Sequence, residues 1–548
     1  MKLHYITRIG LVAAATLWTS IASAQPVITS ILNNASYLRT GLPGSGIAQG
    51  SIFATFGTGM GPAELTQTGF PLPAELAGTS MRISVGGNEV NAIMVYTSAG
   101  QLASVLPSNT PVGNGVVRVT YNGQTSQPFP IIVVRNALGL FTLNGAGSGP
   151  AVLTDANFGV ITYTNAAIEG QTVIAWGTGL AGANFPDNQP AQVFDFQQQV
   201  PTRVLVGGKP ATLRYAGRSN CCAGLDQIIF DIPEGVRGCN VSLTIRAAGT
   251  PGNFTTIPVS GPSRVCSDEN GFTEADLNIP ADGLKIGSIS LTRSTAKISS
   301  PQGTIETKSD AASASFIKFD ANSFIRGQGA GQASYGSCSV ITYSTSPGGA
   351  PSFTLLDAGP SLTLTTPGGN RTLNKMSGFY FVDLGSSTII PGIPLPGGTP
   401  PVLEPGSYSM AGNGGADVGA FRANTTLPAN FLWTNQDTTT NVTRQRELNI
   451  TWSGGNPSTD FVTMTGSSTS GGVGATFVCT ERASAGQFNV PVEVLSSLPA
   501  SATASGIPTG SLSVGNSSAG AGSRFTAPGI NVGFFTYYTF HTKNVTVD

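Results

Sequence analysis

Charged residues and histidine are scarce in this sequence. Asp, Glu, Lys and Arg make up 10% of the 548 residues, whereas ordinary soluble domains contain about 25%. Helices with salt-bridged exposed faces are therefore excluded as the main architecture. Two histidines occur, His4 and His541, so a zinc site built from several histidines is excluded as well. No metal ion or cofactor is predicted.

The sequence also lacks the motifs of nucleophilic catalysis and phosphate binding. It contains no G-x-S-x-G at a strand-to-helix turn, no P-loop and no G-x-G-x-x-G that opens a helix. His541 follows an alternating aromatic run that is typical of a plain β-strand, so no catalytic residue is predicted. Glycosidases need only two carboxylates that meet in space. A hydrolase therefore stays open as an alternative, with candidates Asp460, Glu447, Glu481 and Glu493.

Low net charge and the lack of long apolar runs limit the partners. The formal net charge is −1, so no bulk field attracts nucleic acid or an anionic membrane. The best interior apolar run, residues 131–134, is closed by Arg135, and no membrane span is predicted in the mature chain. Residues 1–24 have a basic start, an apolar stretch and a small-x-small end, which predicts a cleaved signal peptide. We expect a secreted or cell-surface protein.

What the chain has in abundance is glycine, in a repeated arrangement. Gly57-Thr58-Gly59 is matched by Gly177-Thr178-Gly179, and Gly86-Gly87 is matched by Gly207-Gly208 at a similar offset. Glycine motifs that recur in the same order at a nearly constant offset indicate two copies of one unit. We place the copies at residues 25–137 and 138–262.

Short alternating apolar segments between GG, NG and PG turns predict that each copy is an antiparallel β-sandwich. In the first copy, Val117, Val119 and Tyr121 are expected to share one face of a strand, with Arg118 and Thr120 on the other. An acidic linker is predicted at 263–283. A β-rich domain (284–425) and a β-sandwich-like C-terminal domain (426–548) are predicted to follow. The expected fold class is all-β: tandem immunoglobulin-like β-sandwiches followed by a further β-sandwich region.

Four segments of the two copies resemble a known family: ITSILNNASY (28–37), SIFATFGTGMGP (51–62), FPLPAELAGTSMRISVGG (70–87) and YAGRSNCCAGLDQIIFDIPEGV (215–236). They resemble the uncharacterised C-terminal domain family multiplied in Acidobacteria of the Solibacter type, and in outline the IPT/TIG immunoglobulin-like modules. The resemblance covers about residues 28–260. It implies an immunoglobulin-like double sandwich, an accessory part of exported proteins, and brings no catalytic residues.

Six cysteines follow the predicted signal peptide, and an even number in an exported chain indicates disulfides. They are Cys221, Cys222, Cys239, Cys266, Cys338 and Cys479. Cys338 and Cys479 both lie in alternating, β-branched segments, which predicts a disulfide between two strands.

The other four cysteines are predicted to pair across a longer stretch of chain. Adjacent cysteines seldom bond to each other, because the small ring strains the peptide between them. We therefore expect Cys221 and Cys222 to bond separately to Cys239 and Cys266.

One segment near the C-terminus, residues 533–540, favours binding. Its residues Phe534, Tyr538 and Phe540 share one face, which would stack on sugar rings if exposed. If both faces are buried, the same strand is part of the hydrophobic core, which is the role that large aromatic side chains favour. Trp433 and Trp452 allow the same two roles.

The sequence thus predicts an exported, non-enzymatic β-sandwich protein that serves in binding, adhesion or structure. The expected partner is an extracellular glycan or protein. The alternative is a secreted polysaccharide hydrolase that uses carboxylates in the C-terminal half. No oligomeric state is predicted.

Overall fold

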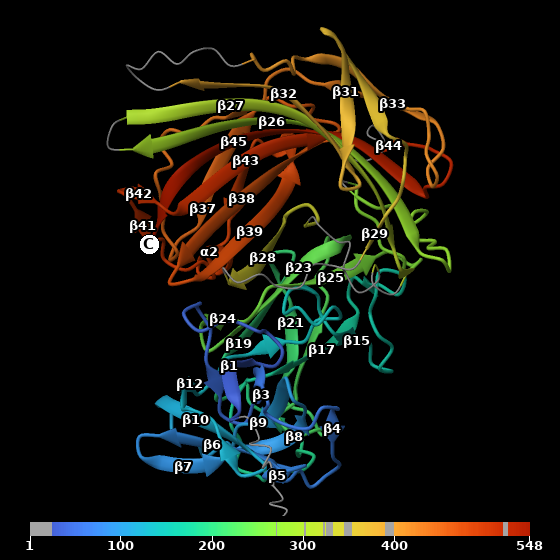
Figure 1. The fold of residues 1–548 in the computed structure, drawn as a ribbon. Helices are drawn as coiled ribbons and strands as arrows, with labels where there is room; N and C mark the ends of the chain where they lie inside the picture. The colour runs from blue at the N-terminus through green and yellow to red at the C-terminus, as the bar shows by residue number, and fades with distance from the viewer. Residues whose placement is uncertain are drawn as a thin grey trace, which may run out of the picture.

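The computed structural model is built almost entirely of β-strands (Figure 1). It describes residues 25–548 except 270, 301–302, 322–323, 325–332, 345–352, 390–398 and 519–523. The all-β fold with tandem immunoglobulin-like sandwiches is confirmed. The predicted signal peptide lies outside the described residues. Within them, no helix has the length and apolar character needed to cross a membrane.

The first copy is a sandwich of two sheets around one core. Its first sheet has the order β1 (Val27–Asn33), β3 (Ile52–Thr58), β9 (Gln101–Val105), β8 (Ile93–Thr97), β4 (Thr66–Gln67). Its second has the order β2 (Ile47–Ala48), β12 (Phe129–Val134), β10 (Gly113–Tyr121), β6 (Thr79–Val85), β5 (Glu75–Leu76), with β7 (Asn88–Asn91) beside β6 and β11 (Gln124–Thr125) beside β10. Val117 and Val119 of β10 are buried and Arg118 is exposed, as their alternation predicts.

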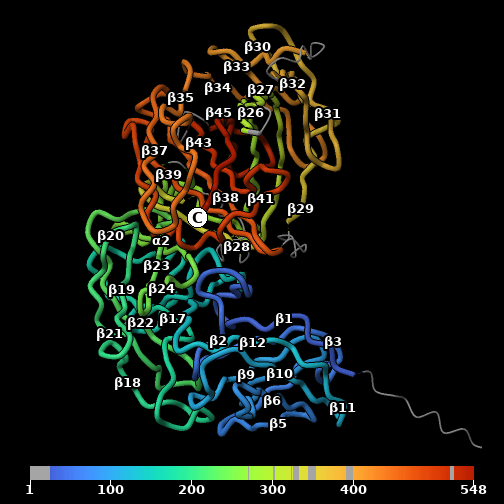
Figure 2. Tube along the Cα trace, turned by 90° about the vertical axis from the view of Figure 1, so that its left-hand side faces the viewer, coloured from blue at the N-terminus to red at the C-terminus, as the bar shows by residue number. Residues whose placement is uncertain are grey.

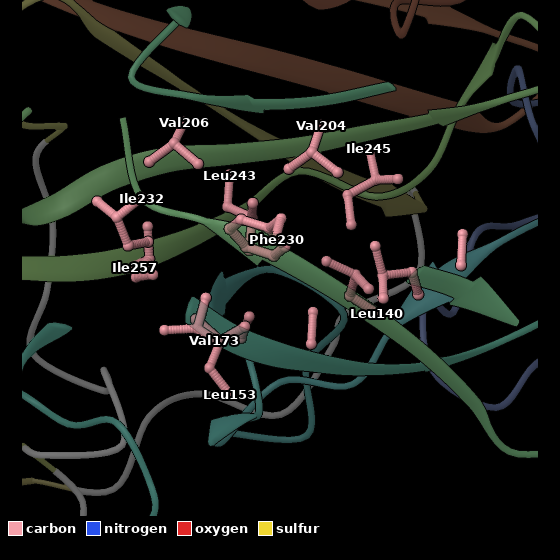
Figure 3. Packing of buried hydrophobic residues seen from close by; sticks show 14 of the residues in the cluster. Leu140, Leu153, Val173, Val204, Val206, Phe230, Ile232, Leu243, Ile245 and Ile257 are labelled. Carbon is pink, nitrogen blue, oxygen red and sulfur yellow. The ribbon is translucent and has the colours of Figure 1, made fainter. Parts of the chain in front are cut away.

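The second copy repeats this strand order except at the last strand of its second sheet. Its first sheet is β13 (Gly139–Leu140), β17 (Thr172–Thr178), β22 (Asp226–Asp231), β21 (Thr212–Arg218), β18 (Phe194–Asp195), with β15 (Leu153–Thr154) beside β17. Its second is β14 (Gly149–Pro150), β25 (Thr255–Ser260), β23 (Gly238–Ala247), β19 (Thr202–Val206), β20 (Lys209–Pro210), with β16 (Ala167–Ile168) beside β25 and β24 (Thr250–Pro251) beside β23. Side chains such as Val173, Phe230 and Leu243 fill the space between the sheets (Figure 3).

The repeated glycines are required by close backbone contacts. A Cβ added at Gly57 would collide with the carbonyl oxygen of Val27 on the neighbouring strand, and one at Gly177 would collide with that of Gly139. Gly59 and Gly179 have positive φ angles of 65° and 104°, which glycine adopts without steric cost. The same backbone crossing therefore recurs in both copies.

Hydrogen bonds join the two copies. The side-chain amide of Asn33 donates to the carbonyl oxygen of Thr178 at 3.1 Å. The hydroxyl of Thr178, in the repeated Gly-Thr-Gly motif, accepts from the backbone N–H of Ile52 at 2.8 Å. Asp187 accepts from both the backbone N–H and the hydroxyl of Ser108. The copies are thus held side by side (Figure 2).

One 15-stranded sheet organises the C-terminal half. Its main path is β28 (Ser337–Ser344), β39 (Val473–Arg482), β38 (Asp460–Ser470), β43 (Gly510–Ser518), β45 (Val532–Val547), β26 (Leu284–Ser300), β27 (Gly303–Phe319), β32 (Phe379–Ile389), β31 (Gly369–Met376), β30 (Ser361–Thr366), β33 (Gly406–Gly412), β34 (Phe421–Leu427). The side strands are β29 (Thr354–Leu355), β36 (Asn441–Val442) and β44 (Arg524–Phe525). The long strands β26, β27 and β45 bend over the second copy (Figure 1).

Smaller elements complete this half. A three-stranded sheet has the order β35 (Leu432–Trp433), β37 (Leu448–Ser453), β40 (Gln487–Val490), and β41 (Thr503–Ala504) pairs with β42 (Ile507–Pro508). The described residues of this half include the helical turns η2 (Ala483–Ala485) and α2 (Val492–Leu495).

The boundary predicted between residues 425 and 426 does not divide two sheets. Strand β45 pairs with β26 from before this point and with β43 from after it, because parallel pairing brings the last strand beside the first strand of the region. The hydrophobic cores do separate near this point. One core draws mainly on residues 289–427, the other on residues 431–547, and β45 contributes side chains to both.

The acidic linker packs between the second copy and the large sheet. Asp276 pairs with Arg524 at 2.7 Å, and Glu269 pairs with Arg482 at 2.6 Å. Leu277 joins a small core with Ile286 at the start of β26. The carboxylates thus attach the linker to the C-terminal half.

Three disulfides are present among the described residues. Cys338 of β28 lies opposite Cys479 of β39 and bonds to it, as the alternation of both segments predicts.

The predicted pairing of Cys221 and Cys222 with Cys239 and Cys266 is wrong. Cys221 bonds to Cys222, and Cys239 bonds to Cys266. The two pairs lie in different parts of the structure. Cys239 and Cys266 are buried beside the linker, whereas the loop of Cys221 and Cys222 lies at the joint between the copies, where Ala223 packs against the first copy.

Peptide mapping under non-reducing conditions tests this connectivity. We expect one peptide that contains an internal Cys221–Cys222 disulfide and a second product that links Cys239 to Cys266. A peptide that joins Cys221 or Cys222 to either of the other two cysteines would contradict the structure.

Candidate functional site

A cavity of about 590 Å³ lies between the large sheet and the linker. Its floor comes from β45, β26, β27, β38 and β39, and its other side comes from the linker and the second copy. The volume falls within the range of about 300–1,000 Å³ that is usual for ligand sites.

Strand β45 gives the cavity its aromatic side chains. Phe534, Tyr538 and Phe540 line the cavity and are half-buried. Phe535 and Tyr537 point to the opposite face and are buried in a hydrophobic core. The two faces therefore divide the two roles that the sequence allowed: one is core and the other lines a cavity.

Tyr538 and Phe540 stack on each other, and we call this stacked pair the platform. Their ring centroids are 5.7 Å apart and the ring planes differ by 5°. Phe534 is engaged by protein groups, since the ring of Phe272 meets it edge-on at 5.7 Å and the Arg524 guanidinium lies 5.1 Å from its centroid. Tyr538 and Phe540 line the cavity without such contacts to Phe272 or Arg524.

Small hydroxyl side chains surround the platform. Parallel pairing of β26 with β45 places Ser288 opposite Phe534 and Ser290 opposite Thr536. On the other side of β45, β38 adds threonine hydroxyls. Those lining the cavity are Ser288, Ser290, Thr463, Thr465, Ser518 and Thr536. The Ser518 hydroxyl is buried and has no hydrogen-bond partner among the described residues, so it has bonding capacity to offer a ligand.

Among the described residues that line the cavity, Asp268 is the one with an ionisable carboxyl. It accepts hydrogen bonds from the Cys239 backbone N–H at 3.0 Å and the Ser334 hydroxyl at 2.6 Å. Burial raises the pKa of Asp268, which lowers the cost of holding it uncharged. With a single carboxyl and no Lys, Arg or His in its described lining, the cavity favours a neutral ligand.

The candidate hydrolytic carboxylates do not meet in this cavity. Asp460 is buried in a separate pocket of about 320 Å³, where Tyr537, Asn516 and the Asn456 backbone N–H donate to it. Burial raises the pKa of Tyr537, so it keeps its proton.

The other three carboxylates and the histidine do not come together as a catalytic pair either. Glu493 pairs with Arg246 of the second copy at 3.0 Å, Glu447 is exposed, and the Glu481 carboxylate accepts from the next backbone N–H. His541 contacts the Phe431 carbonyl at 3.1 Å, and burial lowers its pKa. No group of three His, Cys, Asp or Glu side chains that could hold a metal ion occurs in the described part of the chain.

Trp433 and Trp452 are core residues. Both are buried in the C-terminal hydrophobic core, and the Trp452 indole N–H donates to the Ala483 carbonyl at 2.9 Å. They are not available to stack on a ligand.

Sequence reasoning missed Phe272 and the hydroxyl rows. The sequence could have revealed the hydroxyl rows, because Ser288, Ser290 and Thr292 alternate with buried apolar residues, as do Thr463 and Thr465. Phe272 lies in an irregular linker and has no such signal.

No protein-family model matches the chain, and no curated protein matches it. Solved structures that align with it include domains 5–6 of the S-layer protein SbsC, with 12% identity over 43% of this chain and 99% of that chain, and a TM-score of 0.17. Titin domains A168–A170 align with 11% identity over 71% and 91%, and a TM-score of 0.13. The four N-terminal Ig domains of Dscam1 align with 11% identity over 86% and 92%, and a TM-score of 0.11. The fold assignment rests on the sheets themselves.

Proposed function

We propose that this protein is an exported, non-enzymatic binding protein whose cavity holds a neutral extracellular glycan. The observation that carries the proposal is the stacked Tyr538–Phe540 platform in a cavity whose described lining has a single carboxyl and is rimmed by serine and threonine hydroxyls. A sugar ring has an apolar C–H face and hydroxyl edges, and these match an aromatic platform and a hydroxyl rim.

The rest of the chain supports this role. The disulfides suit an oxidising compartment outside the cytosol. We propose that the tandem sandwiches, as members of the Solibacter-type family, hold the C-terminal half at the cell surface or in the surrounding matrix. A retaining or inverting glycosidase requires two carboxyl groups on either side of the scissile bond, and Asp268 stands alone in the described lining of the cavity. Binding is therefore favoured over hydrolysis.

A Tyr538→Ala substitution tests the platform. We expect the affinity for a bound neutral oligosaccharide to fall about tenfold, because a loss of about 1.4 kcal/mol of stacking corresponds to that factor. Isothermal titration calorimetry measures the change. Phe158→Ala is the matched control, because Phe158 is an exposed aromatic of the second copy outside the cavity, and it should bind as the wild type does. Equal affinity of the Tyr538 variant and the wild type would refute the platform.

A further inference from the structure

The sheet face that lines the cavity continues beyond it onto β32. Phe381 of β32 lies opposite Ser313 of β27, which lies opposite Ser290 of β26. Ser290 in turn lies opposite Thr536 of β45. Residues that are directly opposite in paired strands project on the same face, so these four side chains form one row across the sheet.

Strand β32 carries a second aromatic group on this face. Phe379 and Phe381 are 41% and 47% exposed, whereas Tyr380 between them is fully buried. Met376, opposite Phe379 on β31, is 63% exposed. Neighbouring exposed apolar side chains of this size mark interaction sites.

Only small side chains separate the two aromatic groups. The intervening positions on β26 and β27 are Ser288, Ser290, Thr292, Ala311, Ser313 and Ser315. The hydroxyls of Ser290 and Ser313 are hydrogen-bonded to each other at 2.8 Å. These six positions form a strip of short, polar or small, uncharged side chains, which we call the serine strip.

The separation exceeds what a short sugar spans. Three steps between neighbouring strands lie between β32 and β45, and each step is about 4.8 Å, so the two aromatic groups are at least about 14 Å apart. A mono- or disaccharide on the Tyr538–Phe540 platform does not reach Phe381.

We propose that the binding site takes an internal stretch of a long, unbranched, neutral polysaccharide that lies across β45, β26, β27 and β32. Tyr538 and Phe540 hold one part of the chain inside the cavity, and Phe379 and Phe381 hold another part outside it. The serine strip lets the chain lie close to the sheet. This inference rests on the proposed function and specifies its ligand.

The test measures affinity against chain length. The probes are neutral oligosaccharides of the cellulose, xylan, mannan and α-glucan types, each from disaccharide to octasaccharide, titrated by calorimetry. For the wild type we expect affinity to rise with length until the chain reaches β32. A Phe379→Ala/Phe381→Ala variant should lose about tenfold in affinity for the long chains and none for the disaccharides. Ile389→Ala is the control for a general effect on β32, because Ile389 is 63% exposed but lies at the far end of the strand, opposite Glu306 of β27, and circular dichroism checks the fold.

The outcomes separate this inference from the proposed function. If the double variant binds long chains as tightly as the wild type does, or if affinity is independent of length, the extended site is wrong and the glycan site in the cavity stands. If the wild type binds none of the four glycan types at any length, both proposals fail. If the double variant loses disaccharide binding as well, its effect is not local to β32 and the extended site is again refuted.

Discussion

An Arg218→Met substitution is expected to lower the free energy of unfolding of the tandem sandwiches by about 3–5 kcal/mol at pH 7. Arg218 and Asp226 form an ion pair at 2.9 Å whose side chains are 2% and 0% exposed. The arginine also donates to the Ala181 carbonyl. Without it, a buried carboxylate remains without its countercharge, and that penalty dominates the loss.

The pH dependence of this loss has a defined sign. Burial raises the pKa of Asp226 to about 6 against the Arg218 charge, which lowers it, and removing the charge raises it further. The folded carboxyl then takes up a proton that the unfolded one, with its lower pKa, has released. The variant should therefore be less damaged at pH 5 than at pH 7.

Urea unfolding, monitored by hydrogen exchange of the backbone amides of β17 and β22, measures both the loss of stability and its pH dependence. Arg214→Met is the matched control, since Arg214 also pairs with an aspartate, Asp231, but its side chain is 60% exposed. Exposed pairs contribute about 0–1 kcal/mol, so this control should unfold almost as the wild type does. Equal losses for the two variants would show that burial does not set the strength of the Arg218 pair.

Replacing both Cys338 and Cys479 with alanine is expected to cost the C-terminal half about 3–5 kcal/mol of stability. The disulfide closes a loop over a sequence separation of 141 residues, and the chain entropy it removes from the unfolded state grows with loop length. Trp433 and Trp452 share the core of this disulfide, so their fluorescence reports unfolding in urea.

The Cys221→Ala/Cys222→Ala variant is the control for removing a disulfide. Its cysteines are adjacent and close no loop of chain, so the variant should retain nearly all of the wild-type stability. A loss as large as that of the Cys338/Cys479 variant would contradict the loop argument.

Local patterns in the sequence predicted the features that depend on nearby residues. The repeated Gly57 and Gly177 led to two copies with nearly the same strand order, because each glycine answers a backbone contact within its own copy. The alternation around Cys338 and Cys479 identified two strands, and the disulfide follows from their register.

Features that depend on long-range packing were not predictable in this way. Alternation in residues 533–540 defined two faces, but only the curvature of the sheet and the linker decide that Tyr538 lines a cavity and Tyr537 is core. For the same reason Trp433 and Trp452 could not be told from binding residues. Pairing of β45 with β26, far apart in sequence, carries one sheet across the boundary expected at 426, although the hydrophobic cores separate near it.

Binding of a neutral glycan in the cavity without cleavage is tested by calorimetric titration of the protein with the four neutral oligosaccharide types, followed by chromatography of the sugars. We expect saturable binding of at least one type, weaker in the Tyr538→Ala variant, with every oligosaccharide recovered at its original length. Absence of binding to all four types, or recovery of shortened sugars, would refute the proposed glycan site.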